Sequence, residues 1–206
     1  MDQTFNQTTA TDPADRPTAG ARIVGLLAVL GGAGLLVAMV TVAGGLMRTP
    51  PLTWAGIWAD PFLGVVMFAG ATGGFIALCV ALAGLGMAIG PERDPLVASV
   101  AAIGAIGGAF GVLGFPIGFF AMPIAALIVV LHLARIGRLP TSIAVLHLTA
   151  VVGSVVVSAL WAQNASLGGG DLIVLLYPAS WIAIGLALYH GRPASGSLAS
   201  WPTLGR

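Results

Sequence analysis

The three histidines are the residues of this sequence whose type and spacing come closest to a site for chemistry. His132, His147 and His190 each lie near one end of a long apolar stretch. Imidazoles on neighbouring helices can hold a haem iron or another metal, so His132 and His147 are candidate haem or metal ligands. The alternative is that each ring lies at the membrane surface, bonded to water or lipid headgroups. We expect this alternative, with no metal and no cofactor bound.

Other patterns typical of enzymes are missing from the sequence. It contains no Gly-x-Ser-x-Gly, no His-Glu-x-x-His and no Gly-x-x-x-x-Gly-Lys segment. The single cysteine, Cys79, rules out an internal disulfide and a multi-cysteine metal site, and we expect it to be a small buried thiol. Ser154 and Ser158 lie in an apolar stretch, where serines usually bond to the backbone or across helices. These observations predict a protein that is not an enzyme.

The composition indicates the kind of element that must position these residues. Apolar residues make up 58% of the 206-residue chain and charged residues only 7%, and the mean hydropathy is +1.02. Repeated long apolar runs are typical of membrane spans. The chain has no lysine and no basic patch with interleaved aromatic residues, so nucleic-acid binding has no support. The composition therefore predicts a polytopic membrane protein.

The longest uncharged stretch runs from Leu96 to Ala134 and contains 39 residues. One straight helix of that length would extend roughly 58 Å at 1.5 Å per residue. The hydrocarbon core of a bilayer is about 30 Å thick. The stretch therefore predicts two helices, with a reversal at Gly114–Gly118, where Pro116 removes a backbone donor and the glycines allow a tight turn.

The remaining apolar runs complete an all-α bundle of six transmembrane helices. The other four predicted spans are Ile23–Met47, Phe62–Ile89, Ile143–Trp161 and Leu172–Tyr189. Asp60 followed by Pro61 is a favourable start for the second of the six spans, because Asp caps helices well and Pro suits the first helical position. We expect residues 1–21 to be a disordered polar tail, residues 22–190 the transmembrane domain, and residues 191–206 a flexible tail.

The arginines predict how the bundle is oriented. With six spans and a cytoplasmic N-terminus, the inner segments hold seven arginines and the outer segments only Arg48. Such a bias is the positive-inside pattern, and it places both termini in the cytoplasm of a cell-membrane protein. If residues 96–134 formed a single pass, the later arginines would change sides and the bias would vanish. The inner arginines are Arg16, Arg22, Arg93, Arg135, Arg138, Arg192 and Arg206.

Glycines at helical spacing mark the faces along which helices are expected to meet. Five of them fall within an arc of roughly 120° at 100° per residue: Gly104, Gly107, Gly108, Gly111 and Gly114. Two further small pairs with four-residue spacing are Gly34 with Ala38 and Gly70 with Gly74. In lipid, close approach of backbones over small residues holds helices together. A glycine face can also line a cavity or a moving contact, but tight packing is the simpler interpretation.

Three functions remain open from the sequence. The first is a non-enzymatic accessory subunit or small permease-like module that packs in the lipid bilayer against another membrane subunit or a second copy of itself. It is favoured by the glycine faces and by short loops, which leave little room for an active site outside the membrane. The second is a haem- or metal-binding redox subunit that uses His132 and His147. The third is a transporter for a neutral or apolar solute. No predicted span carries an acidic or basic residue in its interior, which counts against an ion-coupled pump or a proton-driven exchanger but does not exclude such a transporter.

Overall fold

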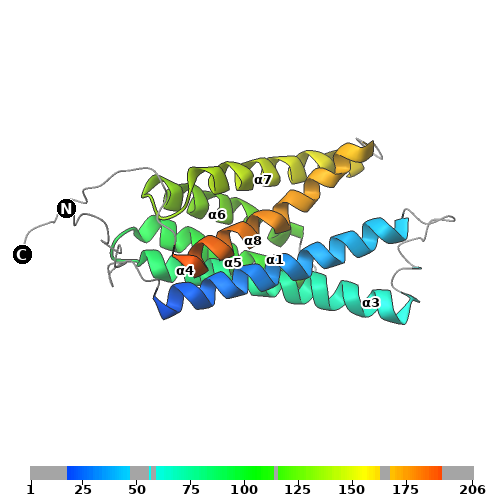
Figure 1. The fold of residues 1–206 in the computed structure, drawn as a ribbon, viewed down its shortest axis with the longest axis horizontal. Coiled ribbons are helices and arrows are strands. Elements are labelled where there is room, and N and C mark those ends of the chain that lie inside the picture. The colour runs from blue at the N-terminus through cyan, green and yellow to red at the C-terminus, as the bar shows by residue number, and fades with distance from the viewer. Residues whose placement is uncertain (1–17, 47–55, 57–58, 114–115, 163–167, 192–206) are drawn as a thin grey trace, which may run out of the picture.

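The computed structural model describes residues 18–46, 56, 59–113, 116–162 and 168–191, and their regular secondary structure is entirely helical. These residues form six helical rods (Figure 1). In chain order the rods are α1 (Ala19–Leu46); α3 (Pro61–Met67) continued by the π-helical turn η2 (Phe68–Gly73) and α4 (Gly74–Ile89); α5 (Pro95–Val112); α6 (Pro116–Arg135); α7 (Thr141–Ala162); and the 3-10 helix η3 (Gly168–Leu175) continued by α8 (Leu176–His190).

Five of the rods are long and apolar enough to cross a membrane. They comprise Ala19–Gly44, Pro61–Ile89, Pro95–Val112, Thr141–Leu160 and Leu172–His190. The sixth rod, α6, has a shorter apolar portion in its described side chains, Phe120–Arg135. The prediction of an all-helical protein with apolar helices suited to a membrane is confirmed.

The predicted reversal within residues 96–134 is present. α5 ends at Val112, α6 begins at Pro116, and the two helices pack extensively against each other. At about 1.5 Å per residue, the 18 residues of α5 and the 20 of α6 extend about 27 and 30 Å. Gly114 and Phe115 themselves lie outside the described residues. The long uncharged stretch is therefore a helical hairpin.

Two aspartate–proline pairs start helices at opposite ends of the molecule. As expected, Asp60 caps α3, and its Oδ1 accepts hydrogen bonds from the backbone N–H groups of Phe62 and Leu63 at 2.9 Å each. Asp94 caps α5 in the same way, accepting from the Val97 N–H at 3.1 Å. A carboxylate at this position satisfies backbone donors that have no partner within the helix. The turn before Asp94 depends on Gly90, whose φ of 84° lies in the region that favours glycine.

Two helices begin earlier than the apolar runs indicated. α1 starts at Ala19 rather than at Ile23, because Thr18 Oγ1 accepts a hydrogen bond from the Ala21 N–H at 3.3 Å and so caps the helix. The last rod starts at Gly168, ahead of the predicted span Leu172–Tyr189. A 3-10 turn at the start of an α-helix is common, and here it extends α8 toward the end of α7.

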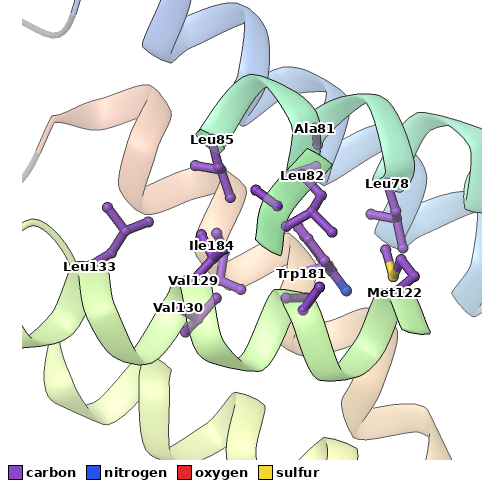
Figure 2. Close-up of a cluster of buried hydrophobic side chains, with 14 of the residues drawn as sticks. Leu78, Ala81, Leu82, Leu85, Met122, Val129, Val130, Leu133, Trp181 and Ile184 are labelled. Carbon is purple, nitrogen blue, oxygen red and sulfur yellow. The ribbon is translucent and has the colours of Figure 1, made fainter. Parts of the chain in front are cut away.

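The core lies where α4, α6 and α8 meet (Figure 2). α4 contributes Leu78 and Leu82, α6 contributes Met122, and α8 contributes Trp181 and Ile184, all fully buried. α1 packs on α8 and on α4, whereas α7 lies at the edge of the bundle, against α6, α8 and η3 (Figure 1). The large buried residues of the core therefore come mainly from the three helices α4, α6 and α8.

The glycines of α5 lie against α4 and α6. A Cβ added at Gly104 would collide with the Ala125 Cβ, and one at Gly107 would lie 2.8 Å from the Ala121 Cβ. At Gly108 it would lie 2.5 Å from Cys79 Sγ and 3.0 Å from Met122 Cβ. Gly111 is buried as well, and Gly114 lies outside the described residues. The other side of α5 is exposed, through Ile103, Ile106, Phe110 and Leu113.

Replacement of Gly108 with Leu should destabilise the protein. The new side chain would enter space already occupied by Cys79 and Met122, and overpacking typically costs about 1–3 kcal/mol. Unfolding in detergent would show a lower Tm for this variant. The matched control is Ile106→Leu, because Ile106 is 59% exposed and the exchange conserves volume. Equal melting temperatures for the two variants would contradict this packing.

Candidate functional site

His147 is a polar residue enclosed in the apolar bundle. It lies on α7 with 0% of its surface exposed, and Ser180 on α8 is buried to the same degree. The expectation that every histidine lies at the membrane surface is therefore wrong for His147. His147 lies six residues after the start of α7, which is compatible with a position near the membrane surface. Its ring, however, points toward α8 and not toward the surroundings of the bundle.

The hydrogen bonds of Ser180 determine which nitrogen of His147 carries the proton. Ser180 Oγ donates its one proton to the backbone carbonyl of Tyr177 at 2.7 Å. The same oxygen lies 2.7 Å from His147 Nδ1, so it must accept a hydrogen bond from Nδ1–H. A neutral His147 then has a bare lone pair on Nε2. Ser180 thus orients the ring and selects its tautomer, as the outer partners of metal-binding histidines commonly do.

Aromatic rings from α8 surround the imidazole. The His147 and Tyr177 centroids are 5.7 Å apart with the rings tilted by 33°, and the Trp181 centroid is 5.6 Å away with its ring edge-on at 86°. The Tyr177 hydroxyl donates to the Met122 thioether sulfur on α6 at 3.0 Å. Thioether sulfur is a weak acceptor. Residues of α6, α7 and α8 therefore build one aromatic site, which we call the His147 site: Met122, His147, Tyr177, Ser180 and Trp181.

Two nitrogens of this site lack a hydrogen bond of good geometry. They are His147 Nε2, an acceptor, and Trp181 Nε1, a donor whose side chain makes only a weak hydrogen-bond contact, with Tyr177, and both atoms are buried. Figure 2 shows the indole nitrogen of Trp181 directed toward the side where Met122 lies. Buried polar groups in native proteins are nearly always paired, so the bare Nε2 of His147 is an exception within this site.

His132, the other candidate ligand, has a separate environment. It lies near the end of α6, 21% exposed, with its Nδ1 3.5 Å from Asp94 Oδ2. Asp94 uses its other oxygen to cap α5, so this carboxylate links the α4–α5 turn to the end of α6. His190 is exposed at the end of α8, edge-on to Tyr189. His132 and His147 thus have different partners, Asp94 and Ser180. Among the residues that the structure describes, no group of three His, Cys, Asp or Glu side chains could hold a metal ion.

The α8 half of the His147 site was missed in the sequence. Tyr177, Ser180 and Trp181 are spaced by three and four residues, which puts them on one face of a helix. A hydroxyl, an indole and a phenol on one face of an apolar span are a recognisable polar stripe. The spacing does not indicate that this stripe meets His147, which is 33 positions away from Ser180.

Comparison with known proteins gives no assignment: no family model, no curated protein and no solved structure matches the chain.

Replacement of Ser180 with Ala should destabilise the fold. It leaves the His147 Nδ1–H buried without an acceptor, and an unpaired buried donor costs about 1–3 kcal/mol. The free energy of unfolding in detergent should fall by that amount. Ser158→Ala is the control, because Ser158 is exposed on α7, and such surface changes usually stay within about 0.5 kcal/mol. A Ser180 variant as stable as this control would show that the bond to His147 contributes nothing.

Proposed function

We propose that this chain is an integral membrane protein that crosses the bilayer six times with both termini in the cytoplasm. In this proposal it works as a non-enzymatic module, an accessory subunit or small permease-like component that packs against a partner. The observation that carries the proposal is the separation of charged ends from apolar helix walls.

Charged side chains gather at one end of the rods. The start of α1, the α4–α5 turn, the α6–α7 turn and the end of α8 lie at the same end of the bundle (Figure 1). Four exposed arginines belong to these segments: Arg22, Arg93, Arg135 and Arg138. Asp60 lies at the opposite end, at the start of α3. A basic end of this kind supports the cytoplasmic side.

The outward-facing sides of the helices carry exposed apolar side chains. Large aliphatic and aromatic side chains are exposed on every rod, for example Val37 on α1 at 54%, Val65 on α3 at 66%, Ile103 on α5 at 67% and Ile124 on α6 at 54%. Each Å² of such surface costs about 25 cal/mol in water, whereas lipid tails solvate it. This distribution supports the bilayer as the solvent for all six rods, α6 included.

The described turns are short. Residues 90–94 join α4 to α5, and residues 136–140 join α6 to α7. Turns of five residues offer no platform for an active site outside the membrane, which supports a role carried out within the bilayer. The glycines of α5 are covered by α4 and α6 of the same chain, so a partner would bind a different face.

The redox alternative now rests on His147 alone. Its bond through Nδ1–H to Ser180 leaves Nε2 as a potential ligand atom, in the orientation that metal-binding histidines use. Transport of a neutral solute also stays a hypothesis, and the His147 site offers it one polar position within the helices.

The six-span arrangement makes a specific prediction for thiol labelling. In a Cys79→Ala background, cysteines at Glu92 and Arg138 should be inaccessible to an impermeant reagent in intact cells, and a cysteine at Ala59 should react. All three positions are exposed, so permeabilised cells provide the control in which all three react. Reaction at Arg138→Cys in intact cells would exclude the six-span model.

A bound partner should increase the mass of the complex measured by native mass spectrometry. Native mass spectrometry of the protein, taken directly from its own membrane into lipid nanodiscs, should give a stoichiometric species heavier than the 20.6 kDa chain. A monomer alone would contradict the accessory role. An absorption spectrum of the same sample tests the redox alternative, and we expect no Soret band. A stoichiometric band lost in His147→Phe but kept in His190→Phe would replace the accessory role with a haem-binding one.

A further inference from the structure

The turn between α6 and α7 carries positive charge that the described chain does not balance. Arg135 and Arg138 are both exposed, and residues 135–146 include no Asp or Glu. Among the residues that the structure describes, the one ion pair joins His132 to Asp94. Neither arginine is therefore neutralised by a carboxylate of the described chain, and both are available to an anion from outside it.

The side chains at this turn indicate which anion they suit. An Arg guanidinium presents parallel N–H groups that match two oxygens of a phosphate. Thr141 and Ser142, exposed at the start of α7, add hydroxyl groups that can donate to phosphate oxygens. Basic residues next to a membrane span attract anionic lipids. A lipid phosphate thus suits the turn, and the unbalanced positive charge favours a lipid with a net negative charge.

One side of α7 continues from the turn as an exposed, largely apolar strip. At about 100° per residue, Thr141, Val145, Val152 and Val156 fall within an arc of roughly 60°. All four side chains are exposed. His147 lies on the opposite side of the helix and is bonded to α8. The strip is therefore separate from the His147 site, and it leads from the charged turn to the apolar part of α7.

The strip runs into a groove between α7 and η3. The groove has a volume of about 430 Å³, and its lining is apolar except for Thr149. Leu148 and Val152 of α7 and Ile173 of η3 belong to this lining. A Cβ added to Gly153 would lie 2.7 Å from Ile173 Cδ1, so the two elements are in close contact at the groove. Because Val152 is 52% exposed, the groove is open to the surrounding lipid and suits an acyl chain.

The distance along α7 matches the length of one lipid molecule. Leu148 and Val152 come seven and eleven residues after Thr141, which is about 10 and 16 Å at 1.5 Å per residue. Half of a bilayer, headgroups included, is about 20 Å thick. A lipid whose phosphate lies at the turn therefore has acyl chains long enough to reach the groove.

We propose that α7 carries a binding site for one anionic phospholipid, with the phosphate at Arg135 and Arg138 and an acyl chain in the groove beside Val152. The inference rests on the membrane location in the proposed function, which thiol labelling tests in cells. Lipid binding is measured on protein in detergent, whatever its orientation in the cell. Failure of the binding experiment would therefore leave the six-span proposal intact.

The test counts the lipids bound to the delipidated full chain by native mass spectrometry in detergent. The probes are phosphatidylglycerol, which is anionic, and phosphatidylcholine, which is zwitterionic, with identical acyl chains. The first phosphatidylglycerol should bind with a Kd at least about tenfold below that of phosphatidylcholine, as expected for two basic side chains at an anionic lipid. Equal Kd values for the two lipids would overturn the proposal.

Substitution of the arginines tests the phosphate position. In the double variant Arg135→Gln, Arg138→Gln, the two lipids should bind with nearly equal Kd. The matched control is Arg93→Gln, because Arg93 is exposed at the same end of the bundle but lies between Glu92 and Asp94. It should keep the preference of at least about tenfold. A loss of preference in Arg93→Gln as large as in the double variant would contradict the site.

Substitution within the groove tests the acyl-chain position. Val152→Trp should fill the groove and remove the tight phosphatidylglycerol step. Val155→Trp should keep that step, because Val155 is exposed to a similar degree, 48%, but does not line the groove. The same result for both variants would overturn the proposal. A species of two chains that Val152→Trp alone separates would also overturn it, since a second copy would then occupy the groove.

Discussion

The packing of α1 against two neighbours depends on direct contact between backbones at glycine. A Cβ on Gly31 would lie 2.8 Å from the Gly74 carbonyl oxygen of α4, and one on Gly32 would lie 2.7 Å from the Pro178 carbonyl oxygen of α8. Lipid tails solvate apolar side chains as well as other side chains do, so helices in hydrocarbon associate through close approach and hydrogen bonds. Adjacent glycines about 100° apart let one helix approach two others.

The close glycine contacts with α1 set the position of α8, and α8 supplies most of the polar side chains inside the bundle. Pro178 lies against α1, while two and three residues later Ser180 and Trp181 are buried beside His147 of α7. The His147–Ser180 hydrogen bond joins the edge helix α7 to the α1–α8 pair. Interhelical bonds of this kind contribute about 1 kcal/mol in membranes. The same bond orients the His147 ring and leaves its Nε2 without a partner.

Features that depend only on residues close together in the sequence could be predicted without the structure. Asp60 with Pro61 predicted a capped helix start, and the length of the Leu96–Ala134 stretch predicted a helical hairpin. Both follow from backbone chemistry or from simple geometry. The helix starts at Ala19 and Gly168 were missed, because a cap or a 3-10 turn extends a helix beyond its apolar run at little cost.

Local sequence patterns were enough to predict apolar helices, most of the helix ends and the helix faces that carry glycine. Contacts between side chains of different helices became known from the three-dimensional fold. The two histidines thought to share a ligand have different partners: Asp94 for His132, and Ser180, 33 positions away, for His147. Periodicity gives the face of a residue within its own helix. It does not give the rotation of a helix about its axis or the axial offset between two helices. A shift of one residue changes the direction of the side chain by about 100°, so these two quantities decide which residues touch.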